Sequence, residues 1–279
     1  MAPATLTTRV RLDPSPGAGP DEERVRRAMD VVIDPELDEP ITDLGFVRSV
    51  EVGAGGPTDV TVHLRLPTSF CSPNFAYLMA SDAKDAVSAL PGVGRVVVEL
   101  DDHHDSAIIN AGLATDAGYR GTFRHEAEQD LDELRETFRR KAHTAAMERA
   151  LTGLLRSRSD LEEARVGDVV LGDLPDDEVT RSLLRRRSEI GLDNDPASPV
   201  LVDAHGTPYA EGDVPMALRR ARSTRISIDG NAHFCRGLLA TRYPGSEADQ
   251  SERPDPERTF VPLTEITTRP TTSTKELPA

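Results

Sequence analysis

One cysteine-containing loop is the part of this chain best equipped for chemistry. Cys71 stands in the segment 67–74, after the β-rich run 60–66 and before a helical pattern over residues 74–90. Unpaired N–H groups and the dipole at a helix N-terminus would stabilise a thiolate there, and Pro73 suits the first helical turn. Because thiolate is both the nucleophilic and the metal-binding form of cysteine, we expect the functional chemistry at Cys71.

Iron suits this position, because the iron of iron–sulfur clusters prefers soft thiolate ligands. A single thiol cannot complete a four-ligand shell, so the second ligand must come from another subunit, a small thiol or a nearby side chain. The competing interpretation is that Cys71 is a small buried hydrophobic residue, which is a common role for cysteine. We favour the functional interpretation.

Two adjacent histidines are the next candidates. His103 and His104 follow the strand pattern 95–100 within an Asp-Asp-His-His-Asp segment. In a strand, neighbouring side chains point to opposite faces, so at most one of them can join Cys71 easily. We favour a solvated loop, and a divalent-metal site at His103 and His104 is the alternative.

Two features of the second half have simpler interpretations. Cys235 lies two residues after His233, which is not a same-face spacing in a helix, so Cys235 is interpreted as a buried structural residue. The segment 219–225 is a basic patch. It would either dock an acidic client or form a solvated face.

Composition excludes several classes of protein. The 279 residues carry a formal charge of −15, which argues against a general affinity for nucleic acid or anionic membranes. The two cysteines exclude a disulfide framework, and no apolar run approaches the ~20 residues that span a bilayer. Residues 1–20 lack the apolar core of a secretory signal. We therefore expect a soluble cytoplasmic protein with reduced thiols.

The elements around Cys71 follow from local patterns. Asp21 is expected to cap a helix that ends near Asp34, and residues 46–66 alternate like a β-hairpin. With the helix 74–90 and the strand 95–100, the order is helix, strand, strand, helix, strand. This order predicts a small α+β domain over residues 21–120, after a flexible leader at 1–20.

A helix-rich α+β region is expected next, over residues 122–243. After a hinge at 118–121, the apolar spacing predicts a long amphipathic helix over 122–155. A second helix follows Asp176, strands near 200–203 and 225–229 suggest a small sheet, and a final helix spans 232–242. The segment 244–279 is expected to be a disordered tail, because it is rich in Pro, Ser, Thr and charge.

Four short motifs of the first domain occur together. They are Asp34-Pro-Glu36, Asp43-Leu-Gly45, Thr68-x-x-Cys71 and Leu90-Pro-Gly-Val93. In this order around one hairpin, they resemble the iron–sulfur cluster assembly family of PaaD and SufT type, whose domain also precedes Mrp-type ATPases. The resemblance covers about 80 of the 279 residues.

The resemblance implies an α+β fold and a role in installing iron–sulfur clusters in client proteins, which for PaaD-type members are multicomponent monooxygenases. It implies that Cys71 is the functional thiol and that Asp34, Glu36, Asp43 and Thr68 line the same face. The cluster would be held transiently and shared with a partner or second subunit, for instance in a homodimer. Expected partners are a client metalloprotein or the cluster-assembly machinery.

The chain departs from the family pattern in three places. Ser72 stands between Cys71 and Pro73, where the family usually has Cys-Pro. The loop after the last strand, often rich in Trp and Pro in relatives, is Asp-Asp-His-His-Asp here. The phosphate-binding loop of an Mrp-type ATPase is absent from the sequence.

Three functions remain in order of preference. The first is a non-enzymatic accessory role in cluster assembly or metalloenzyme maturation through Cys71. The second is a metal-free adaptor or assembly chaperone that binds its client through the helix 122–155 and the basic patch. The third is a thiol enzyme or hydrolase, in which His63, His103 or His104 would activate the cysteine. No recognisable nucleophile motif accompanies these histidines or the cysteine.

Overall fold

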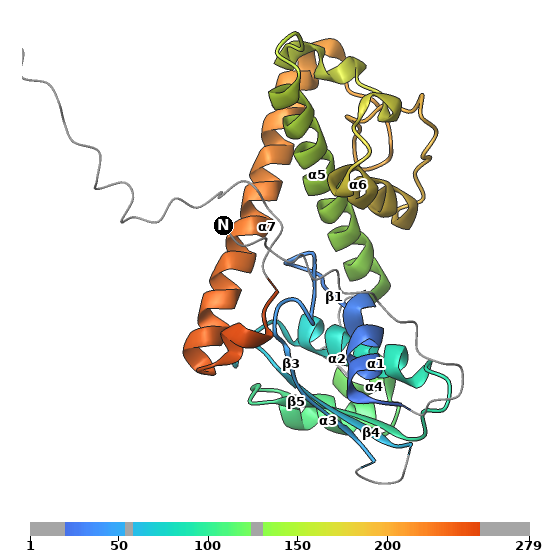
Figure 1. Ribbon diagram of the computed structural model, residues 1–279, viewed down its shortest axis with the longest axis vertical. Coiled ribbons are helices and arrows are strands. Elements are labelled where there is room, and N and C mark those ends of the chain that lie inside the picture. Colours follow the sequence, from blue (N-terminus) through green and yellow to red (C-terminus); the bar gives the residue numbers. More distant parts are fainter. Residues whose placement is uncertain (1–19, 54–57, 124–130, 252–279) are drawn as a thin grey trace, which may run out of the picture.

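The computed structural model describes residues 20–53, 58–123 and 131–251. A small α+β part comes first, and a helical part built around α5 and α7 rises from it (Figure 1). The predicted α+β class is confirmed. The predicted leader, apart from Pro20, lies outside the described residues. No helix in the described ranges is long and apolar enough to cross a membrane.

The α+β part is organised around a three-stranded sheet of order β3–β4–β5, in which β3 and β4 are antiparallel and β4 and β5 are parallel. Strands β1 and β2 form a separate antiparallel pair. The elements in chain order are α1 (Glu22–Ala28), β1 (Ile33–Asp34), β2 (Glu39–Pro40), β3 (Val47–Val52), β4 (Val60–Arg65), α2 (Pro73–Ser88), β5 (Val96–Asp101), α3 (Ser106–Ala114) and α4 (Gly118–Phe123). The predicted hairpin, second helix and strand are confirmed, whereas the first helix ends at Ala28 and not near Asp34, which belongs to β1.

Local chemistry explains where these elements begin. The Asp21 side chain caps α1 by accepting a hydrogen bond from the Arg24 N–H at 2.8 Å. Pro73 occupies the first turn of α2, where its missing N–H costs nothing. Gly45 has φ +75°, as expected for the turn before β3, and a Cβ there would lie 3.0 Å from Cγ of Gln250.

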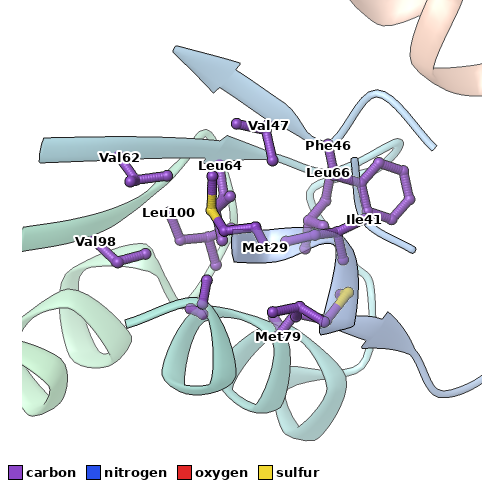
Figure 2. Packing of buried hydrophobic residues seen from close by; sticks show 14 of the residues in the cluster. Met29, Ile41, Phe46, Val47, Val62, Leu64, Leu66, Met79, Val98 and Leu100 are labelled. Carbon is purple, nitrogen blue, oxygen red and sulfur yellow. The ribbon is translucent and has the colours of Figure 1, made fainter. Parts of the chain in front are cut away.

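One face of the sheet forms the main core. Val62 and Leu64 of β4 alternate with more exposed neighbours and point toward Met29 and Met79 in Figure 2. Such period-two alternation buries one face and leaves the other polar. The helices α1 and α2 lie across this buried face (Figure 1).

The helical part has a second core. It is built by α5 (Leu131–Ser157), α6 (Glu178–Glu189), α7 (Val214–Arg242) and the short 3₁₀ turns η3 (Glu163–Asp168), η4 (Leu171–Asp173) and η5 (Glu211–Asp213). The long helix α7 joins the two cores. Its Leu218 packs in the second core, whereas Ala232 and Leu239 are buried in the core of the α+β part. Figure 1 shows α7 running from the far end of α5 down to the α+β part.

The predicted small sheet of the second half is wrong. Residues 225–229 lie inside α7, which begins at Val214 rather than at residue 232. Arg225 and Asp229 form a buried ion pair at 3.1 Å, four residues apart on one helix face. Tertiary packing therefore overrides the strand-like alternation around Ile226 and Ile228. Around 200–203 the described residues contain only isolated bridges.

Two other predictions need correction. The expected hinge at 118–121 is part of α4. The expected tail at 244–279 is ordered at its start, because residues 244–251 carry the 3₁₀ turn η6 (Ser246–Asp249) and Asp249 pairs with Arg65 at 2.5 Å. The rest of that tail lies outside the described residues.

His143 of α5 makes the helical part sensitive to acid. It is 1 % exposed, and burial, followed by the charges of Arg187 and Arg186, lowers its pKa to about 4. Between pH 6.5 and 4 the unfolded chain therefore binds a proton that the folded protein does not. Stability should fall by about 3 kcal/mol over this window.

Urea denaturation at pH 7 and pH 4.5 measures this loss, with His143→Gln as the control that removes the titrating group. The difference between the two proteins should grow as the pH falls. Parallel stability curves for the two proteins would contradict the assignment to His143.

Candidate functional site

Three loops meet at one edge of the sheet. Because β4 and β5 are parallel, the loop 66–72 after β4 and the loop 102–105 after β5 leave the sheet at the same edge. The antiparallel strand β3 begins there, since Val47 pairs with Leu64, so the loop that enters it also lies at this edge. This entering loop, 34–46, carries the acidic residues.

The Cys71 thiol lies half-buried in this loop cluster and is not in a disulfide. Burial raises its pKa, and the negative charges of Asp34 and Glu36 raise it further, against hydrogen bonds from the backbone and side chain of Thr68. The expectation of a stabilised thiolate is therefore wrong for the free protein. Burial and nearby carboxylates outweigh the helix terminus, so a metal must displace a proton from this sulfur.

Asp34 braces the acidic loop. Its Oδ1 accepts hydrogen bonds from the N–H groups of Glu36 at 2.8 Å and Leu37 at 2.9 Å. The side chain is buried, and burial raises its pKa to about 7, with smaller contributions from the charges of Glu36 and Glu39. Asp34 and exposed Glu36 thus lie close enough to Cys71 to act on its charge, as the resemblance implied.

Thr68 and Asp43 have different surroundings. Thr68 lies beside the Cys71 sulfur, and its Oγ1 also accepts the Phe70 N–H at 2.8 Å. The Asp43 carboxylate instead accepts a hydrogen bond from the Ser251 hydroxyl at 2.8 Å, and its carbonyl accepts one from Ser251 N–H at 2.9 Å. Asp43 therefore anchors the C-terminal segment.

Both candidate histidines contact the Cys71 loop, but only His103 bonds to Cys71 itself, whereas the His104 N–H donates to the Ser69 carbonyl at 2.9 Å. His103 is buried, its Nε2 lies 2.9 Å from the Cys71 carbonyl oxygen, and its Nδ1 accepts the Asp105 N–H at 3.0 Å. Both ring nitrogens are thus occupied, and His103 braces the loop through its backbone. His104 is exposed and its ring packs 5.8 Å from that of Phe70.

A separate group of ligand atoms lies on the sheet. His63, Glu99 and Asp101 each place one ligand atom within 4.8 Å of the others. However, Asp101 is already bound by Arg48 at 2.8 Å and by His63 Nδ1 at 3.0 Å. His63 therefore interacts with the carboxylates of Asp101 and Glu99 on the sheet.

Sequence reasoning missed the contribution of α7. Arg236 pairs with Glu39 at 2.7 Å and donates to the Asp43 carbonyl at 3.2 Å. Arg242 donates to the Leu66 carbonyl at 3.1 Å. It also donates to Ser69 Oγ at 2.8 Å and to the carbonyl of Asp102.

The C-terminal half of α7 thus contacts all three loops. The signal for this contact lies in the spacing of Asn231, Cys235, Leu239 and Arg242, which share one helical face.

Residues 22–99 match the family described as "Iron-sulfur cluster assembly protein". The iron-sulfur cluster carrier proteins of Mycobacterium tuberculosis and Mycobacterium leprae are 36 % and 35 % identical over 77 residues, or 28 % of this chain. The chain spans 19 % of the length of these carriers.

An uncharacterized protein of Methanocaldococcus jannaschii is 36 % identical over 93 residues, which cover 33 % of this chain and 93 % of that relative. No solved structure matches the chain. The family match includes Cys71 and the acidic loop. The chain therefore belongs, through its α+β part, to the iron–sulfur cluster assembly protein family.

Proposed function

We propose that this protein binds an iron–sulfur cluster, or its iron, in transit to client proteins, and that Cys71 is the ligand. One observation carries the proposal: the family-matching region places a free, half-buried thiol where three loops meet at the sheet edge. Thiolate is the ligand type that cluster iron prefers. Glu36 is exposed beside it, so the site has an open side.

The cluster is cargo in this proposal. The raised pKa of Cys71 keeps the free thiol protonated, which protects it from oxidation between loading events. Loading replaces the thiol proton with iron, and protonation favours release. The Cys71 thiol is held protonated, and both ring nitrogens of the nearby His103 are occupied, which favours a non-catalytic role. We propose that this role is cytoplasmic, as the composition predicts.

Exposed apolar side chains favour a client surface next to the site. Phe70 precedes Cys71 and is 81 % exposed, and Phe234 and Leu238 of α7 are 62 % and 46 % exposed. Exposed aromatic and aliphatic groups beside a site are typical of protein-binding surfaces. A client metalloprotein or an assembly partner would dock here, and multicomponent monooxygenases are the client class that the PaaD-type resemblance implies.

A metal-free adaptor is the second candidate, and the same exposed groups support it. The basic patch 219–225 supports it less, because Arg222 and Arg225 of that patch bind Glu148 inside the helical part. Client capture that persists in a chain unable to bind iron would favour the adaptor.

Anaerobic loading with iron and sulfide tests the proposal. The intact chain should gain visible absorbance, and Cys71→Ser should lose nearly all of it, because the hydroxyl is a poor ligand for cluster iron. Iron and sulfide are counted after gel filtration. The control Ser69→Ala changes the same loop without removing the sulfur. Equal iron in Cys71→Ser and the intact chain would refute the proposal.

A further inference from the structure

The second cysteine lies on the face of α7 that contacts the Cys71 loops. One turn before it, Asn231 donates a hydrogen bond to Glu36 at 3.2 Å. Two turns after it, Arg242 binds Leu66 and Ser69. Because residues 231, 235 and 242 share a helical face, Cys235 lies between the acidic loop and the Cys71 loop.

Three further observations place the two sulfurs in one environment. Cys235 and Cys71 are both half-buried and free, and both pack against the core of the α+β part. The next residue along, Arg236, pairs with Glu39 of the acidic loop. Burial raises the pKa of Cys235 to about 12, and the charges of Asp34, Cys71 and Glu36 contribute in that order.

An opening borders the same place. A cleft of about 470 Å³ between α5 and α7 is lined by Glu36, Asn231 and Lys141, among others. Solvent therefore reaches the Glu36 carboxylate of the acidic loop through a cleft that α7 borders. The cleft thus brings solvent to Glu36 and Asn231, one helical turn from Cys235.

We propose that Cys235 is the second protein thiolate ligand of the iron that Cys71 binds, so that the two parts of the chain close one site. The inference rests on the proposed function. Each thiol gives its proton to solvent as its sulfur–iron bond forms, with no change in oxidation state. The second ligand is thus assigned to this chain's own α7. Another subunit, a small thiol or another side chain is then not needed as the second ligand.

The full chain, loaded with iron and sulfide without oxygen, tests this assignment. Cys235→Ser should lose iron to a chelator at least about tenfold faster than the intact chain. Adding His233→Cys to Cys235→Ser should not restore retention, because residue 233 is exposed and, two residues from 235, lies on a different face of the helix. Retention by Cys235→Ser equal to that of the intact chain would overturn the inference.

The outcomes separate the two proposals. If Cys235→Ser retains iron while Cys71→Ser does not, the inference fails and the proposed function stands. If Cys71→Ser also retains iron, the proposed function itself fails.

A second measurement needs no substitution. Dibromobimane, which fluoresces when two thiols displace its bromides, should link residues 71 and 235 of the intact chain. The reaction is run to completion at pH 9, because the raised pKa of each thiol leaves little thiolate, and peptide mass spectrometry identifies the link. Only singly attached reagent would overturn the inference, even if Cys235→Ser failed to fold.

Discussion

Glu148→Ala should destabilise the protein by about 3–5 kcal/mol. Glu148 is fully buried in α5, where it binds Arg225 and, at 3.2 Å, Arg222 of α7. Arg225 is 7 % exposed. Removal of the Glu148 carboxylate leaves it one carboxylate partner, Asp229, where the intact protein provides two. A buried cation that loses a partner keeps its desolvation cost, so the α5–α7 pairing should weaken first.

Chemical denaturation followed by circular dichroism measures this loss. Glu136→Ala is the matched control, because Glu136 lies on the same helix and pairs with Arg140 at 2.6 Å but is 42 % exposed. An exposed pair contributes under about 1 kcal/mol. Equal losses in the two variants would show that the buried charges of α5 and α7 do not hold the helices together.

Asp34→Asn should stabilise the free protein at pH 8 by up to about 4 kcal/mol. The Asp34 carboxyl has a pKa of about 7 in the folded protein against 3.8 in the unfolded chain. As the pH rises from 4 to 7, the unfolded chain releases a proton that the folded protein keeps, so stability falls. Asparagine has no such proton, and its Oδ1 can keep the bonds from Glu36 and Leu37.

The pH dependence identifies the cause. The two proteins should be nearly equal in stability at pH 4, and their difference should grow toward pH 8. Thermal melts across this range, with Asp30→Asn in the exposed turn as control, provide the comparison. A difference that does not change with pH would mean that the burial of this carboxyl is not the source.

The α+β part was predictable because its signals are local. The alternation over residues 46–66, the proline at the start of α2 and the Pro91-Gly92 stop each act over a few residues, and the structure follows them. The position of Cys71 after β4 was predictable for the same reason. Its protonation state was not, because burial and the charges of Asp34 and Glu36 arise only in the folded chain.

The role of α7 needed tertiary information. The Ile226 and Ile228 alternation is typical of a strand, and only the burial of Arg225 and Asp229 on one face makes it part of a helix. His233 and Cys235, two residues apart, do not share a helical face, whereas Cys235 and Arg242 do. That face became informative only once its contacts with the loops were known.

Cluster transfer tests the role of Cys71 as a carrier most directly. The loaded intact chain is mixed with an apo-ferredoxin and an iron chelator, and the ferredoxin signal is followed over time. We predict that the ferredoxin gains its cluster faster from the loaded chain than from free iron and sulfide, and that little iron reaches the chelator. Protein from a Cys71→Ser loading reaction should give no such transfer. If the ferredoxin gains its cluster no faster than from free iron and sulfide, Cys71 does not carry clusters to clients.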